Sequence, residues 1–189
     1  LCPFYFISEI FMANIVFIAT SLDSFIAGKN NEIDWLHSIP NPDNLDMGFN
    51  EHMETIDALV MGRNTLELVS GMDCDWPYTK PVFVLSNTLK SVEKDLEGKV
   101  FIVNGDLKQL TKELESKGYS NLYIDGGITI QNFLKEDLID EMVITTIPIL
   151  LGGGIPLFGA LDETMEFRCT QTKHFANGIC QSRFERYRQ

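Results

Sequence analysis

Short apolar runs, many of them rich in β-branched residues, recur along the chain and indicate strands buried on both faces of a sheet. Stretches with apolar residues three or four positions apart lie between them and indicate helices. The alternation predicts an α/β domain with right-handed crossovers and a mostly parallel sheet. The strands are predicted at residues 14–20, 58–61, 81–85, 100–103, 122–124 and 141–150. The helices are predicted at residues 45–56, from about 64, at 107–117, and after Gly126-Gly127 through Leu134.

The C-terminal part of the chain has a different pattern. Asn177 and Gly178, a strong turn signal, separate two stretches at residues 167–175 and 179–187. This arrangement predicts a hairpin that adds antiparallel strands to the sheet. Residues 21–42 are rich in Asp, Asn, Gly and Pro and predict a long loop. A loop of that length in a compact domain is often functional.

Composition excludes several classes of function. The length of 189 residues suits one domain with a sizeable core. A formal net charge of −12 argues against nucleic-acid binding, which needs many cations to neutralise phosphates. Because no cysteines form a CxxC pair and no histidines have metal-binding spacing, we expect reduced thiols, no bound metal and a cytoplasmic protein. The cysteines are Cys2, Cys74, Cys169 and Cys180.

The first eleven residues are apolar, yet they contain Glu9 and no lysine or arginine. They therefore lack the charged region of a signal peptide. Asn14 interrupts the apolar run, so we do not expect a membrane span. We expect residues 1–11 to be an extension before a natural start at Met12, and residues 12–189 to be one domain. An extra strand or a dimer-contact arm is the competing interpretation of the extension.

The segment Gly62–Thr65 is the most informative one for chemistry. An apolar run ends at Gly62, and a helix-forming series begins after Arg63, Asn64 and Thr65. A helix N-terminus offers free N–H groups and the positive end of a dipole, so it favours an anion. Glycine lets a phosphate approach the backbone, and the arginine fork matches phosphate oxygens.

Two other segments resemble this one in position. Ser86-Asn87-Thr88 follows the predicted strand 81–85, and Gly126-Gly127-Ile128-Thr129 follows the strand 122–124. In an open α/β sheet the carboxyl ends of the strands form the ligand-binding edge. Each signal alone is weak, but three at equivalent places predict a nucleotide site. The spacing matches neither GxGxxG nor the P-loop.

Five motifs in this order resemble the dihydrofolate reductase-like superfamily. The closer branch is that of the riboflavin-biosynthesis reductases, which carry this unit as a C-terminal domain. The resemblance runs from about Met12 to the C-terminus. It implies a dihydrofolate reductase-like three-layer fold, an NADPH cofactor, a small-molecule substrate and a homodimer. The motifs are Ile18–Ala27 (IATSLDSFIA), Val60–Glu67 (VMGRNTLE), Val84–Asn87 (VLSN), Tyr123–Gly127 (YIDGG) and Ile139–Met142 with Ile147–Phe158 (IDEM and IPILLGGGIPLF).

The resemblance also implies a set of cofactor residues. Arg63 and Thr65 would meet the cofactor phosphates, and Ser86 and Asn87 would lie near the 2′-phosphate. The remaining positions are Ala19 and Ile26 against the nicotinamide, Gly126, Gly127 and Ile128 at the pyrophosphate, and Gly62, Asn64, Leu85 and Thr129 beside them. Two departures matter. Ser24 stands where the branch usually has Gly, and Asn87 stands where many dihydrofolate reductases have Arg, which leaves the choice between NADPH and NADH open.

Hydride transfer needs an oriented substrate and a proton source. Asp46 lies fifteen residues before Met61, the offset of the substrate carboxylate in folate reductases. Its alternative role, slightly favoured, is a first-turn acid stabilised by the helix dipole. Asp23 belongs to the Ser-Leu-Asp motif, and it could equally cap a loop. Both acids are candidate catalytic residues.

The substrate remains open at this point. Trp35, Phe49 and Met53 could form an apolar wall for a flat heterocycle, or they could belong to the core. The resemblance favours reduction of 5-amino-6-(5-phosphoribosylamino)uracil or a related nitrogen heterocycle. Dihydrofolate reduction and a non-catalytic nucleotide-binding module are the alternatives. A phosphorylated substrate would need a second cationic site, for which the candidates are Lys29, Arg168, Lys173 and Arg183.

Overall fold

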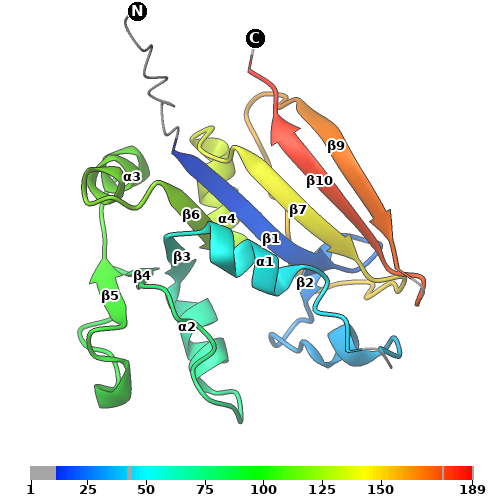
Figure 1. The fold of residues 1–189 in the computed structure, drawn as a ribbon, viewed down its shortest axis with the longest axis horizontal. Coiled ribbons are helices and arrows are strands. Elements are labelled where there is room, and N and C mark those ends of the chain that lie inside the picture. Colours follow the sequence, from blue (N-terminus) through cyan, green and yellow to red (C-terminus); the bar gives the residue numbers. More distant parts are fainter. Residues whose placement is uncertain (1–11, 42–43, 176, 189) are drawn as a thin grey trace, which may run out of the picture.

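The computed structural model describes residues 12–41, 44–175 and 177–188, and an eight-stranded sheet forms its centre (Figure 1). The strand order is β5-β4-β3-β6-β1-β7-β10-β9. All pairs from β5 to β7 are parallel, whereas β10 is antiparallel to both of its neighbours. The predicted α/β sheet and the antiparallel C-terminal hairpin are confirmed. The strands are β1 (Ala13–Thr20), β3 (Ala58–Gly62), β4 (Val82–Leu85), β5 (Val100–Val103), β6 (Asn121–Asp125), β7 (Glu141–Thr146), β9 (Phe167–His174) and β10 (Cys180–Arg186).

Helices cover both faces of this sheet, which makes three layers. They are α1 (Phe49–Thr55), α2 (Arg63–Ser70), α3 (Leu107–Ser116) and α4 (Gly127–Lys135), with short 3₁₀ turns η1 (Asp34–His37) and η2 (Lys94–Leu96). Val60 of β3 belongs to the core under α3 and α4, and the next residue, Met61, belongs to the core under α2. Because successive side chains of a strand point to opposite faces, these two cores lie on opposite sides of the sheet.

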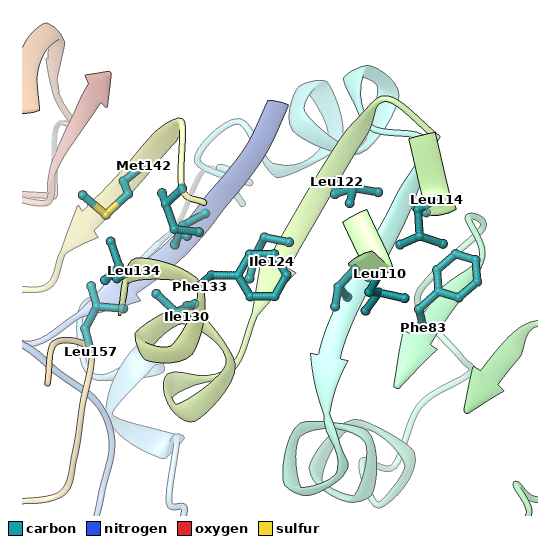
Figure 2. Packing of buried hydrophobic residues seen from close by; sticks show 14 residues of the cluster. Phe83, Leu110, Leu114, Leu122, Ile124, Ile130, Phe133, Leu134, Met142 and Leu157 are labelled. Carbon is teal, nitrogen blue, oxygen red and sulfur yellow. The ribbon is translucent and has the colours of Figure 1, made fainter. Parts of the chain in front are cut away.

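The core under α3 and α4 is the larger one, and Figure 2 shows part of it. Leu110 and Leu114 of α3 pack toward Phe83, while Phe133 of α4 packs toward Ile124 of β6. All five side chains are buried. Fully burying a side chain of this size stabilises the fold by about 1.5–3 kcal/mol. This packing fixes where α4 begins, and its first residues form part of the site described below.

One predicted helix begins later than its apolar pattern indicated. We predicted a helix from residue 45, but α1 begins at Phe49. Met47 and Gly48 have positive φ angles of 53° and 85°, a left-handed conformation that no helix can contain. Asp46 accepts hydrogen bonds from Gly48 N and Asn50 N, at 3.0 Å each, and so holds the turn in front of the helix.

The predicted long loop and the last parallel strand also need correction. The segment 21–42 contains η1 and a strand, β2 (Phe25–Ala27), which pairs with β8 (Ile155–Pro156). We predicted a strand through residue 150, but β7 ends at Thr146. Both corrections arise from contacts between distant segments. At Gly154 a Cβ would overlap the carbonyl oxygen of Ala27, so the approach of β8 to β2 depends on glycine.

Two further expectations concern the predicted extension and membrane spans. The predicted extension, residues 1–11, lies outside the described residues, so its assignment stays a prediction. Among the helices of the described part of the chain, none is long and apolar enough to span a bilayer.

Candidate functional site

A cavity of about 430 Å³ opens where the parallel strands end. Its walls come from the ends of β1, β3, β4 and β6, from the first residues of α2 and α4, and from the segment around β2 and η1. This is the edge at which the sequence predicts a ligand. All the predicted cofactor residues except Ser86 and Asn87 line it, namely Ala19, Ile26, Gly62, Arg63, Asn64, Thr65, Leu85, Gly126, Gly127, Ile128 and Thr129.

Two helices begin at this cavity. Gly62 precedes α2 and Gly126 precedes α4, and neither helix start has a side-chain cap in the described structure. The first N–H groups of a helix have no partner within the helix. Together with the helix dipole, they form an anion-binding surface. The two helix starts therefore place two such surfaces on one cavity.

Glycines let the two helix starts approach each other. At Gly126, where φ is 89°, a Cβ would overlap Thr65 Oγ1 on the opposite wall. At Gly62 a Cβ would lie only 3.1 Å from Thr129 Oγ1. The sequence suggested that these glycines admit a phosphate. The structure adds a second reason for them, which is that the walls pack closely against each other.

Arg63 connects the start of α2 to the turn after β4. Its Nε lies 2.6 Å from Glu67 Oε1, and its Nη1 donates to Thr88 Oγ1 over 3.3 Å. Ser86 Oγ accepts hydrogen bonds from the backbone N–H groups of Thr88 and Leu89, at 3.2 and 3.0 Å. Ser86 therefore stabilises this turn. The predicted cofactor roles of Ser86 and of its exposed neighbour Asn87 stay predictions.

Asp125, the last residue of β6, also lines the cavity, and sequence reasoning did not single it out. One hydrogen bond is formed by its carboxylate, with Gly126 N donating to Oδ1 over 2.8 Å. Burial raises the pKa of this carboxyl to about 6, and the hydrogen bond from Gly126 opposes that shift. A largely buried carboxyl that lines a cavity and has a raised pKa is typical of a functional acid.

A signal for Asp125 was present in the sequence. It is an acid at the carboxyl end of a buried strand and directly before the glycine pair. Tyr78 lines the same cavity, and the pKa of its hydroxyl is raised by burial and by the charge of Asp125. The carboxylate of Asp125 therefore lies close enough to the hydroxyl of Tyr78 to oppose its ionisation.

The two acids that the sequence selected lie elsewhere. Asp46 is exposed and caps α1, and the hydrogen bonds from Asn50 and Gly48 lower the pKa of its carboxyl. Asp23 accepts from Ser21 Oγ over 2.6 Å and from Gly152 N over 2.7 Å. The hydroxyl of Ser21 is the main cause of its lowered pKa. Neither carboxylate lines the cavity, so each has the structural surroundings that we weighed as its alternative role.

The predicted apolar wall is also absent from the cavity. Phe49 and Met53 pack against the core under α2. The indole Nε1 of Trp35 donates to the carbonyl oxygen of Glu32 over 3.2 Å. The apolar part of the cavity lining comes instead from the segment around η1, from α2 and from the segment after it. These residues are Ile33, Leu36, Val69, Met72 and Tyr78.

Comparison with known proteins agrees with this architecture. The family model described as "RibD C-terminal domain" matches residues 14–181. An "Uncharacterized protein YwjB" of Bacillus subtilis (strain 168) is 35% identical over 167 residues, which are 87% of this chain and 93% of that protein. A crystal structure from Shewanella sp. PV-4, named "Putative riboflavin biosynthesis protein", is 59% identical with a TM-score of 0.91. The match covers 94% of this chain and 100% of that one.

A dihydrofolate reductase shares the fold at low sequence identity. The enzyme from Enterococcus faecalis, complexed with NADP(H) and RAB-propyl, is 18% identical with a TM-score of 0.64. The match covers 94% of this chain and 99% of that chain. The dihydrofolate reductase-like fold predicted from the motifs is thereby confirmed.

Proposed function

The chain belongs to the RibD C-terminal domain family, and from this premise we propose that it is an NADPH-dependent reductase of a small nitrogen heterocycle or its ribosyl derivative. The observation that carries the proposal is that one cavity is lined by two uncapped helix starts, by Arg63 and by Asp125. The helix starts suit the phosphates of a dinucleotide, and Asp125 supplies an acid beside them. The shared fold with an NADP(H)-binding reductase supports the choice of cofactor.

The residues present fit a dinucleotide phosphate group. The N–H groups at the starts of α2 and α4, with Arg63 and Thr65, would hold the phosphates. The apolar side chains of Ala19 and Ile26 would contact the nicotinamide face. NADPH, when bound, supplies the hydride. The Glu67 carboxylate, 2.6 Å from Arg63 Nε, holds the guanidinium in place before a phosphate arrives.

Asp125 performs the acid–base part of the proposed reaction. Reduction of a C=N bond leaves a nitrogen that must take up a proton, and a buried carboxyl with a pKa of about 6 can donate one. Its partner Gly126 N orients the carboxylate, and water from the open cavity mouth would reprotonate it. Loss of a positioned general acid costs about 10²–10⁴-fold in rate.

Titration with NADPH and NADH, followed by fluorescence or calorimetry, tests the cofactor. We expect Arg63→Ala to weaken NADPH binding by about tenfold, because a charge-assisted contact contributes about 1.5 kcal/mol or more. Arg168→Ala removes a surface arginine over Tyr187 and is the matched control. The proposal fails if neither nucleotide binds to the unmodified chain.

Consumption of NADPH in the presence of ribosylaminouracils and related heterocycles tests the reaction. We expect Asp125→Asn to lower kcat by about 100-fold or more while the Kd for NADPH changes less than about threefold. An unchanged kcat in this variant would remove Asp125 from the chemistry without affecting the cofactor proposal.

The expected homodimer stays a proposal as well. β9 is the last strand of the sheet, and its side chains are exposed along nearly its whole length. An edge strand of this kind offers unpaired backbone groups to another strand. Light scattering gives the mass in solution, and a monomer at micromolar concentration would contradict the proposal.

A further inference from the structure

A second cavity, of about 170 Å³, lies between α1 and the C-terminal hairpin, and it shares no lining residue with the cavity described above. α1 passes over β1 (Figure 1), where the ring of His52 stacks on that of Phe17. The hairpin contributes four polar side chains to the lining, two from each strand, and each one on β9 lies opposite one on β10. They are Gln171 and Lys173 of β9 with Arg183 and Gln181 of β10. Because cross-strand partners and residues two apart share one face, all four point toward α1.

Lys173 and Arg183, two of the four candidates for a second cationic site, therefore meet in this cavity. The other two candidates, Lys29 and Arg168, line neither cavity. Arg183 Nη1 lies 3.1 Å from Glu141 Oε1, and this ion pair fixes one end of the guanidinium. Within the described ranges, Nε and Nη2 of Arg183 and the ammonium of Lys173 form no hydrogen bond or ion pair. These donors remain available to an anion that enters the cavity.

His52 gives an independent indication of a ligand. It lines the cavity and is 7% exposed, and its Nε2 is buried without a hydrogen-bond partner in the described part of the structure. Burial is the main cause of its lowered pKa, so the ring is neutral at pH 7.5. A buried polar atom without a partner is costly and uncommon. A polar ligand in this cavity would give Nε2 the partner that the protein itself does not supply.

Gln181 offers a fixed acceptor in the same cavity. It is also 7% exposed, and its Nε2 donates to the carbonyl oxygen of Met47 and to Thr145 Oγ1, at 2.8 Å each. These two hydrogen bonds hold the amide in one orientation. Its Oε1 accepts no hydrogen bond from the residues that the structure describes. The Oε1 atom can therefore accept from a hydroxyl group of a ligand without first being reoriented.

We infer that this second cavity binds a small hydroxycarboxylate, with its carboxylate on Arg183 and Lys173 and its hydroxyl group on Gln181. The guanidinium fork suits a planar carboxylate. Because Glu141 already balances Arg183, Lys173 leaves one positive charge for the ligand. The exposed Glu51 also lines the cavity and opposes a second negative charge, so a monoanion is favoured over a phosphate dianion. The inference does not rest on the proposed function, because the two cavities share no lining residue.

A matched pair of ligands, lactate and its neutral amide lactamide, tests this inference. The full chain without NADPH is titrated with each ligand at pH 7.5, and binding is followed by calorimetry and by the NMR signals of the His52 ring. We expect lactate to bind with a Kd of about 1 mM or tighter, and lactamide at least about tenfold more weakly because it lacks the charge. The signals of His52 should move with lactate. Those of His37 in η1, which does not line the cavity, should stay unchanged.

Three results of these titrations would overturn the inference: no binding of lactate, equal affinity for lactamide, and binding of lactate that leaves the His52 signals unchanged. Inorganic phosphate is the third probe, and we expect it to bind more weakly than lactate. Tighter binding of phosphate would overturn the assignment to a carboxylate. Failure of NADPH to bind would affect only the proposed function.

Two variants at exposed positions of β9 provide a second, independent arm. Lys173→Gln removes the unpaired cation, and we expect it to weaken lactate binding at least about tenfold. Its control is Arg168→Gln, which removes a charge from the same strand outside the cavity and should leave the affinity unchanged. Gln171→Glu adds a negative charge inside the cavity and should weaken binding by a similar factor, whereas Gln109→Glu adds it on α3 and should not. Equal effects in a variant and its control would overturn the inference.

Discussion

The two ends of the cavity are built in different ways. The end at the starts of α2 and α4 consists largely of backbone N–H groups, glycines and one arginine, all from short motifs that follow strands. The apolar part of the lining consists of side chains from the segment around η1, from α2 and from the segment after it, and Asp125 of β6 lies directly before the start of α4. The first end is recognisable from local sequence, whereas the second depends on which distant segments the fold brings together.

The largest effect is expected from closing the gap between the two helix starts. Gly126→Ala puts a Cβ into Thr65 Oγ1 and also forces a non-glycine residue to a φ of 89°. The positive φ costs about 1–2 kcal/mol and the overlap about 1–3 kcal/mol more. We expect the free energy of unfolding to fall by that sum and NADPH affinity to fall by more than about tenfold. Chemical denaturation and nucleotide titration measure the two quantities.

Gly118 is a suitable control for this variant. Its φ is 90°, and nothing lies within 4 Å of the position where its Cβ would be. Gly118→Ala should therefore show the strain of the positive φ, about 1–2 kcal/mol, without loss of NADPH binding. If both variants lose the same stability and both bind NADPH normally, the close packing of the walls is not what Gly126 is needed for.

The next effect concerns the carboxyl of Asp125. The pKa of Asp125 is raised to about 6, above its value in an unfolded chain. The native state therefore binds more protons than the unfolded state between pH 4 and 6, so this group's contribution to stability is lost as pH rises through 6. We expect Asp125→Asn to raise the free energy of unfolding at pH 7.5 by up to about 3 kcal/mol. Denaturation curves across pH 4–8 measure it.

A second group titrates in the same window with the opposite sign. His52 stacks on Phe17 and contacts Tyr123 edge-on, with ring centroids 4.8 Å away in both cases. Burial, and then the charge of Arg183, lower the pKa of His52 to about 4. Its contribution to stability is lost as pH falls from about 6.5 to 4. The informative quantity is therefore the difference in the free energy of unfolding between the unmodified chain and Asp125→Asn. If this difference did not change with pH, the titration near pH 6 could not be assigned to Asp125.

The smallest effect is expected from the ion pair between Glu67 and Arg63 at the start of α2. Glu67 and Arg63 form an exposed ion pair within one helix turn, with about half of each side chain accessible. Such pairs contribute about 0–1 kcal/mol to stability. We expect Glu67→Gln to change stability by less than that and NADPH affinity by less than about fivefold, since Thr88 still holds the guanidinium.

The exposed pair between Lys108 and Glu136 provides the control, with a distance of 2.9 Å. Glu136→Gln removes a comparable ion pair outside the cavity lining and should leave NADPH affinity unchanged. A loss of NADPH affinity greater than about tenfold in Glu67→Gln alone would show that positioning of Arg63 by Glu67 dominates the first end.

The success of sequence reasoning follows the same division. The strands and the starts of α2 and α4 were predicted because apolar periodicity and a glycine after a strand are local features. The start of α1 was predicted too early, because the apolar residue Leu45 lies on the helical spacing although it is 40% exposed. Only the left-handed residues Met47 and Gly48 interrupt that pattern, and their conformation is not visible in it.

The three aspartates show most clearly where prediction from local sequence ends. Asp46 and Asp23 each had a local reason to be catalytic and a local reason to be a cap. In the structure each carboxylate accepts backbone N–H groups of a turn or loop. Asp125 belongs to the Tyr123–Gly127 motif, which the sequence analysis identified. Its raised pKa arises from burial, and no local sequence pattern indicates that burial. Burial is a property of the assembled fold.

By itself, the sequence determined the α/β class, the sheet edge at which the cavity opens and the two helix starts that line it. These depend on interactions within about ten residues, which the order of side chains specifies directly. Only the tertiary structure decided which acid faces the cavity and which apolar residues surround it. It also decided that the second set of cations lies elsewhere. Those features depend on how β1, β6 and the segment after α2 come together in space, which no local stretch of the sequence specifies.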